Sequence, residues 1–289
     1  AGWMATSDEG GYLSATNTYL DAIKVDKIWY TFPVGDRGTA WIGPKIENYY
    51  MHATTPSLYS PTLKQFTLGG NAAAYGASTN SGLGYAYRFD NGLAISSNVV
   101  SKQNKSSTAS GATGFLTKES ATSWATQVGY TQPNYAVSAI LNLKYNGWTD
   151  EYFSTANGYA RPYSSDSTNI GLRAWLRPEE SGSAIPSISL GYDTSDIQKG
   201  AATVDSSAMY FVGLGWNDTF RADDKIGVAL GQPQKREDET TDPFGWEAYY
   251  AFKTNDSTEY RTTVFGGSDR NGTANDDITG VVFQTTFKF

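Results

Sequence analysis

Hydrophobic and polar side chains alternate through most of this chain, and the alternation is clearest at its C-terminal end. In 277–289, Val281, Phe283, Thr285, Phe287 and Phe289 fall on one face of an extended strand, and mostly polar residues fall on the other. About thirteen segments repeat the pattern, many of them with aromatic residues at their ends. A soluble sandwich can also alternate, but aromatic residues at the strand ends are typical of a transmembrane β-barrel.

The connections between these segments alternate between short and long. The predicted strands are 24–32, 38–46, 81–88, 92–100, 122–131, 134–144, 167–176, 184–192, 206–217, 225–231, 243–253, 257–266 and 277–289. Most are close to the roughly 9–11 residues that a tilted membrane strand needs. Short turns at one end and long loops at the other are typical of bacterial outer-membrane barrels. The sequence therefore predicts an all-β fold, a transmembrane antiparallel β-barrel of the porin type.

The longest connection, 47–80, has a special place in this scheme. In a complete barrel of about 16 strands, counting back from the last strand makes 38–46 the fifth strand and 81–88 the sixth. In porins the loop at that place folds into the lumen and narrows it. The count also predicts that three strands precede residue 24 and are missing from this sequence. Residues 1–23 would then be an outer loop or the remnant of a missing N-terminal part, and 24–289 the pore domain; a strand at 12–20, giving 14, is the alternative.

The face opposite to the aliphatic residues should line the lumen. Its polar and charged side chains are Lys45, Arg88, Asn142, Lys144, Arg173, Glu247, Glu259 and Arg261. Cations outnumber anions in this set, although the whole chain has a formal net charge of −7. A lumen lined by Arg and Lys favours the passage of anions. The alternative is that these groups form ion pairs that line water and do nothing more.

The loop itself offers a second set of residues, which would form the constriction. These are Glu47, Tyr49, Tyr50, His52 and Lys64. His52 is the only histidine of the chain, and cysteine is absent. A metal site or a Ser–His catalytic site is therefore not expected, because neither has its partner residues nearby. We predict no enzyme activity and no cofactor.

Composition excludes several other classes of protein. Hydrophobic residues make up 39% of the chain, and no apolar run approaches the ~20 residues of a membrane helix. A barrel can cross a membrane with so few apolar residues because only every second residue meets lipid. The sequence pI of about 4.8 and the lack of a basic patch argue against nucleic-acid binding.

Several motifs carry a resemblance to a known family. They are the run from Asp26 to Asp36 (DKIWYTFPVGD) followed by Trp41-Ile-Gly-Pro44, and the runs 185–192, 215–220, 227–234 and 246–252 with the terminal 285–289. Taken together over 24–289, they resemble the cyanobacterial outer-membrane porins of the Som type. These are related to the OprB-like carbohydrate-selective porins and are often named iron-uptake porins.

The resemblance implies a location, partners and a function. It implies a passive channel in a Gram-negative, cyanobacterial outer membrane for ions and small hydrophilic solutes, with inorganic nutrients, iron and sugars as candidates. Membrane lipid and lipopolysaccharide would surround the barrel, and peptidoglycan would be reached only through an N-terminal S-layer-homology domain absent from this sequence. General porins are trimers, and the polar Thr39, Ser97 and Thr126, assigned to the outward face, suggest a homotrimer contact. The alternative is a structural envelope protein or surface receptor with a plugged barrel.

Overall fold

Thirteen β-strands form one antiparallel sheet in the described part of the chain, each strand paired with the next. The computed structural model describes residues 25, 27–67, 74–75, 79–102, 115–117, 120–146, 166–198, 206–237, 239–269 and 273–288. The strands are β1 Ile28–Val34, β2 Gly38–Glu47, β3 Thr79–Arg88, β4 Leu93–Lys102, β5 Ala121–Thr131, β6 Tyr135–Tyr145, β7 Ser167–Leu176, β8 Ser187–Ile197, β9 Ser206–Asn217, β10 Lys225–Arg236, β11 Phe244–Asn255, β12 Thr258–Ser268 and β13 Ile278–Phe287.

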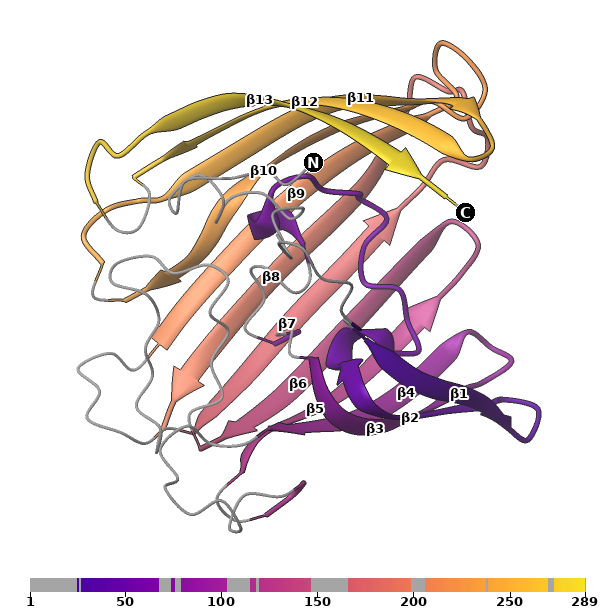
Figure 1. The fold of residues 1–289 in the computed structure, drawn as a ribbon, viewed down its shortest axis with the longest axis vertical. Coiled ribbons are helices and arrows are strands. Elements are labelled where there is room, and N and C mark those ends of the chain that lie inside the picture. The colour runs from indigo at the N-terminus through magenta and orange to yellow at the C-terminus, as the bar shows by residue number, and fades with distance from the viewer. Residues whose placement is uncertain are drawn as a thin grey trace.

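The sheet is strongly curved, with a concave and a convex face, and β1 and β13 are its two edge strands (Figure 1). No pairing joins β1 to β13 among the described residues, so the sheet is not closed. The predicted all-β antiparallel fold and the alternation of short and long connections are confirmed. All the short connections, such as 35–37 and 132–134, lie at one end because every strand reverses direction. We call this the short-turn end.

The strand boundaries agree with the predicted ones to within three residues, with three larger differences. β1 begins at Ile28 rather than at residue 24. β8 continues to Ile197, five residues beyond the predicted end at 192. β10 continues to Arg236 and contains Pro233, which its pairing with β9 accommodates by a register shift between Gln232 and Lys235. A bulge is a place where a sheet tolerates proline. The alternative strand at 12–20 lies outside the described residues.

The two faces of the sheet differ in the way that alternation predicts. On β6 and β7, for example, Val137, Leu141 and Leu172 on the convex face are 49%, 42% and 50% exposed. The residues between them, such as Ile140 and Asn142, are buried on the concave face. One residue was assigned to the wrong face: Thr39 pairs with the inaccessible Ala86 and so lies on the concave face. No helix in the described ranges is long and apolar enough to cross a membrane.

Candidate functional site

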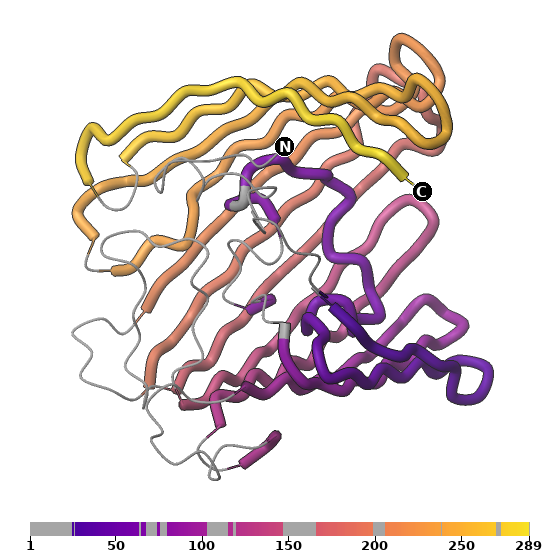
Figure 2. The backbone as a smooth tube through the Cα atoms, viewed as in Figure 1, coloured from indigo at the N-terminus to yellow at the C-terminus, as the bar shows by residue number. Residues whose placement is uncertain are grey.

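Residues 48–66 leave the end of β2 and cross the concave face of the sheet, and we call them the inner segment. In Figure 2 this part of the chain runs along the concave side of the sheet, from β2 toward the C-terminal strands. Its only regular structure is two short 3-10 helices, η1 Asn48–Tyr50 and η2 Lys64–Phe66. Buried backbone groups need hydrogen-bond partners, so an irregular segment in this place depends on side chains from the sheet.

The inner segment is bound first to β4, where the hydroxyl of Ser96 accepts the amide of Ala53 at 3.2 Å, and then to β5. The amide N–H of Thr54 donates to Oε1 of Gln127, and Nε2 of Gln127 donates back to the carbonyl of Thr54, both at 3.0 Å. One step further along, the indole N–H of Trp175 on β7 donates to the carbonyl of Thr55 at 2.9 Å. Gln127 is wholly inaccessible, so this pair of bonds holds the segment without competition from water.

The second attachment is to β8 and β11. The hydroxyl of Ser189 accepts hydrogen bonds from the amides of Leu58 and Tyr59. The carboxylate of Glu247 accepts the amides of Thr62 and Leu63, the latter at 2.6 Å. The hydroxyl of Tyr59 also donates to it at 2.8 Å. Ser189 on β8 and Glu247 on β11 therefore supply acceptors for four backbone amides of the inner segment.

Arg261 and an apolar cluster complete this second attachment. The guanidinium of Arg261 on β12 donates to the carbonyl and the hydroxyl of Ser60 and lies over the ring of Tyr249. The hydroxyls of Thr62 and Thr263 are 2.9 Å apart. Side chains from the segment and from the sheet form one buried apolar cluster: Tyr59, Leu63, Phe66, Met209, Phe211, Ala229, Tyr249, Ala251 and Phe265.

A third contact joins Ala74 and Tyr75, further along the same connection, to the middle of the sheet. The carboxylate of Asp193 accepts the amide of Ala74 at 3.2 Å and forms a buried ion pair with Arg173. Nδ2 of Asn142 donates to the carbonyl of Ala74 at 2.8 Å. Arg173 also lies over the ring of Tyr75. Asp193 thus neutralises the buried charge of Arg173 and also binds the backbone of the connection.

Glycines lie beneath these crossing points, on alternate strands. A methyl group added at any of them would come within 3.0 Å of a residue of the connection: Gly84 on Met51, Gly129 on Thr54, Gly171 on Ala74, Gly213 on Tyr59 and Gly245 on Gln65. These glycines on β3, β5, β7, β9 and β11 form a track that lets the chain approach the sheet closely. Sequence reasoning missed the track, although inward-facing glycines within strands are its visible signal.

The residues predicted to form a constriction lie along the first half of the connection. The carboxylate of Glu47 pairs with Lys27 at 2.9 Å. Tyr49 and Tyr50 are in ring contact, and Tyr50 also stacks on Trp29. The ring of His52 contacts Tyr75 edge-on, and burial lowers the pKa of His52 to about 3. His52 is therefore neutral near pH 7. The side chain of Lys64 lies outside the described part of the chain.

The residues predicted to line the lumen divide into two groups. Buried are Asn142, Lys144, Arg173, Glu247 and Arg261, each at most 8% exposed. The contacts with the connection described above are those of Asn142, Arg173, Glu247 and Arg261. More exposed are Lys45, Arg88 and Glu259. In the second group, Lys45 donates to the carbonyl of Val25, Arg88 lies 3.5 Å from the hydroxyl of Thr39, and Glu259 is 3.7 Å from Lys225. The inward-facing Asp193 was missed because the predicted strand ended at 192.

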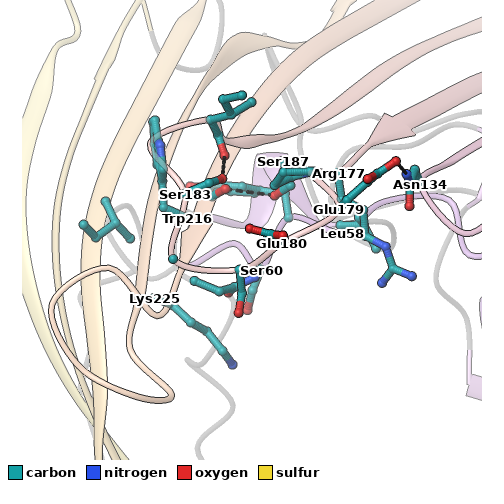
Figure 3. A pocket seen from close by; sticks show the side chains of 18 of the residues that line it. Leu58, Ser60, Asn134, Arg177, Glu179, Glu180, Ser183, Ser187, Trp216 and Lys225 are labelled. Atoms are coloured by element: carbon teal, nitrogen blue, oxygen red, sulfur yellow. Dashed lines mark hydrogen bonds between the residues drawn. The ribbon is translucent and has the colours of Figure 1, made fainter.

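A cavity of about 630 Å³ lies between the inner segment and the short-turn end of the sheet. Figure 3 shows it from close by, with Ser60 of the inner segment facing the turn that carries Glu179 and Glu180. Arg177, Lys225 and Trp216 also contribute to its lining. Nδ2 of Asn134 donates to Glu179 at 3.2 Å, which links two neighbouring short turns. The lining of the cavity therefore contains positively and negatively charged side chains together with the aromatic Trp216.

Comparison with known proteins shows which fold this is. No family model matches the chain, and no curated protein matches it. Among solved structures, the anion-selective porin of Comamonas acidovorans matches with a TM-score of 0.62 and 13% identity over 89% of this chain and 76% of that one. OprB of Pseudomonas putida matches with a TM-score of 0.58 and 14% identity over 89% and 71%. A loop L8 deletion mutant of OmpT, an outer membrane protein of Vibrio cholerae, matches with a TM-score of 0.53 and 13% identity over 87% and 76%. The chain thus has the fold of outer-membrane porins.

Proposed function

We propose that this protein is a porin, a passive diffusion channel of the outer membrane for ions and small hydrophilic solutes. The observation that carries the proposal is the contrast between the two faces of the sheet. The convex face exposes large apolar residues along nearly every strand, such as Trp124 at 52% and Phe283 at 72%. The concave face carries most of the charged and amide side chains of the strands, beside the apolar cluster at Tyr59, and is crossed by the inner segment. A sheet of this kind suits lipid outside and water inside.

The attachments of the inner segment favour a constriction over a plug. The segment lies against the sheet at its contacts with Gln127, Ser189 and Glu247. A cavity remains between it and the short turns. A chain that follows the wall narrows a lumen and leaves room beside it. The alternative of a structural protein with a plugged barrel would require the remaining hollow to be filled.

The charges of the wall support at most a weak anion preference. Arg173 is paired with Asp193, and Glu47 with Lys27, so each of these pairs contributes little net charge. The cavity at the short-turn end has Arg177 and Lys225 opposite two carboxylates. Inorganic nutrients, iron complexes and sugars remain the candidate solutes, and selectivity between them would come from size more than from charge.

The same proposal includes the surroundings of the protein. Membrane lipid and lipopolysaccharide would contact the convex face. A homotrimer interface would include the polar residues Ser97 and Thr126 on that face. Their hydroxyls are hydrogen-bonded at 3.0 Å, and the indole N–H of Trp124 donates to Ser97 at 2.9 Å. A polar pair of this kind is better covered by a neighbouring subunit than by lipid.

Swelling of liposomes tests the proposal. Vesicles containing the full-length protein should swell in isotonic solutions of small sugars and salts, at rates that fall steeply as the solute becomes larger. Vesicles with the same mass of a heat-denatured sample serve as the control. Equal rates for both samples, with every solute, would show that the protein is not a diffusion channel and would favour the plugged barrel.

A further inference from the structure

Among the described residues, the attachment of the inner segment at Glu247 is the one at which a carboxylate of the sheet accepts backbone amides of the segment. At Gln127 and Ser189 the partners are neutral side chains. At Glu247 a fully buried carboxylate accepts two amides and one hydroxyl, all from residues 59–63. Hydrogen bonds to an ionised acceptor are about twice as strong as those between neutral groups. Glu247 therefore holds residues 59–63 more tightly than a neutral acceptor such as Gln127 or Ser189 would.

The surroundings make Glu247 hard to replace. Tyr59 rests on Gly213, where even a methyl group would be 2.6 Å from its ring, so the segment and β9 are already in close contact. Arg261 holds the neighbouring Ser60 through its carbonyl and its hydroxyl. Between these two restraints, the amides of Thr62 and Leu63 have Glu247 as their acceptor. Without the carboxylate, two buried donors would lose their partner, and the segment would leave the wall to recover hydrogen bonds with water.

We propose that Glu247 is the positioning residue that sets the bore of the channel, because it fixes residues 59–63 of the inner segment against β11 and β12. The inference rests on the proposed function. Removal of the carboxylate should free this part of the segment to move into the lumen. The channel would then show unsteady conductance and a smaller size limit for neutral polymers, while the sheet stays folded.

The test compares Glu247→Gln with Glu259→Gln. Both variants remove one negative charge from neighbouring strands, β11 and β12, but the ion pair of Glu259 is with Lys225 and not with the inner segment. A glutamine at 247 has one acceptor oxygen in place of two. Its NH2 group would face the N–H and O–H donors of the inner segment and could not accept their hydrogen bonds. In a planar bilayer both variants should shift the reversal potential in the same direction. Only Glu247→Gln should add open-channel noise and lower the size limit. Identical noise and size limit in the two variants would overturn the inference.

A disulfide supplies a rescue that a purely electrostatic role could not explain. The hydroxyls of Thr62 and Thr263 are 2.9 Å apart, and the chain contains no cysteine. Thr62→Cys and Thr263→Cys, added to Glu247→Gln, should form a bond on oxidation. Oxidation should then return conductance to steady values, and a reductant should undo the effect. Noise that persists in the fully oxidised protein would contradict the positioning role.

Proteolysis separates failure of this inference from failure of the proposed function. Trypsin can cut after Lys64, next to Gln65, which is 1% exposed. In detergent, Glu247→Gln should be cut there about tenfold faster or more than Glu259→Gln, as expected when a buried N–H loses its partner. If the parent protein does not conduct but the two variants still differ in cleavage, the proposed channel function is wrong and the positioning role of Glu247 stands. Equal cleavage of the two variants would show that Glu247 does not position the inner segment.

Discussion

The buried ion pair between Arg173 and Asp193 makes a quantitative prediction about stability. The side chains of both residues are at most 1% exposed. Asp193→Asn keeps the shape of the side chain but removes its charge. An asparagine can still accept the amide of Ala74, but its NH2 group cannot balance the guanidinium. Loss of one partner from a buried pair typically costs about 3–5 kcal/mol. Because Arg173 also donates to the carbonyls of Leu172 and Tyr192, we expect the lower end, about 3 kcal/mol.

Unfolding by urea in lipid vesicles, followed by the fluorescence of the 8 tryptophans, gives the measurement. With a slope of about 3 kcal/mol/M, the upper end for urea, the midpoint should fall by about 1 M. The matched control is Asp242→Asn, because Asp242 pairs with Lys235 but its side chain is 89% exposed. Exposed pairs contribute about 0–1 kcal/mol, so this midpoint should barely move.

A double variant checks the reasoning behind that number. Replacement of a buried ion pair by uncharged residues of similar size is often neutral. Asp193→Asn with Arg173→Met should therefore recover most of the stability that Asp193→Asn alone loses. A midpoint for Asp193→Asn equal to that of Asp242→Asn, or a double variant less stable than the single one, would refute this account of the buried pair.

Three further predictions concern other parts of the molecule. Gly213→Val should push Tyr59 off the sheet and speed tryptic cleavage of the inner segment, since the new side chain has no room; unchanged cleavage would contradict the close contact. In the turn before β10, burial favours the neutral form of Asp224, but the amides of Phe220 and Thr219 hold its pKa below the usual range. Ionised Asp224 should therefore contribute its full stabilisation of the folded protein above the unfolded pKa of about 3.9, and this stabilisation should disappear as the pH falls through the lower pKa of the folded state. The urea midpoint of Asp224→Asn should lie below that of the parent at pH 7, and the two midpoints should converge in acid. Phe283→Lys on the convex face should destabilise the folded protein in lipid by up to about 2–4 kcal/mol, near the cost of a lysine at the bilayer midplane; an unchanged urea midpoint in vesicles would argue that this face does not meet lipid.

The faces of the strands could be predicted from the sequence because a period of two has one physical meaning in a sheet. Val281 and Phe283 were assigned to one apolar face on that ground, and both are exposed on the convex face. The pattern failed where both faces are polar. Thr194, Ser195 and Asp196 gave no alternation, so β8 was ended early and Asp193 was left out of the wall.

The burial of the predicted lumen residues could not be read from the strands. Tyr59 and Glu247 are 188 positions apart in sequence and meet only because the connection after β2 returns across the concave face. Residues such as Arg173 and Arg261 therefore looked like a positively charged wall, whereas the structure shows them bound to Asp193 and to Ser60. Phe289, which was assigned to the apolar face of the last strand, lies outside the described part, and the total of about 16 strands remains a prediction.

Single-channel recording of the full-length protein in a planar lipid bilayer tests the central claim most directly. If the polar concave face encloses a water-filled path beside the inner segment, addition of the protein should give discrete steps of ohmic conductance. Neutral polymers small enough to enter the cavity near Ser60 and Glu180 should reduce each step, and larger ones should not. Stable insertion without any conductance steps would contradict the account, because it would mean that the inner segment closes the barrel.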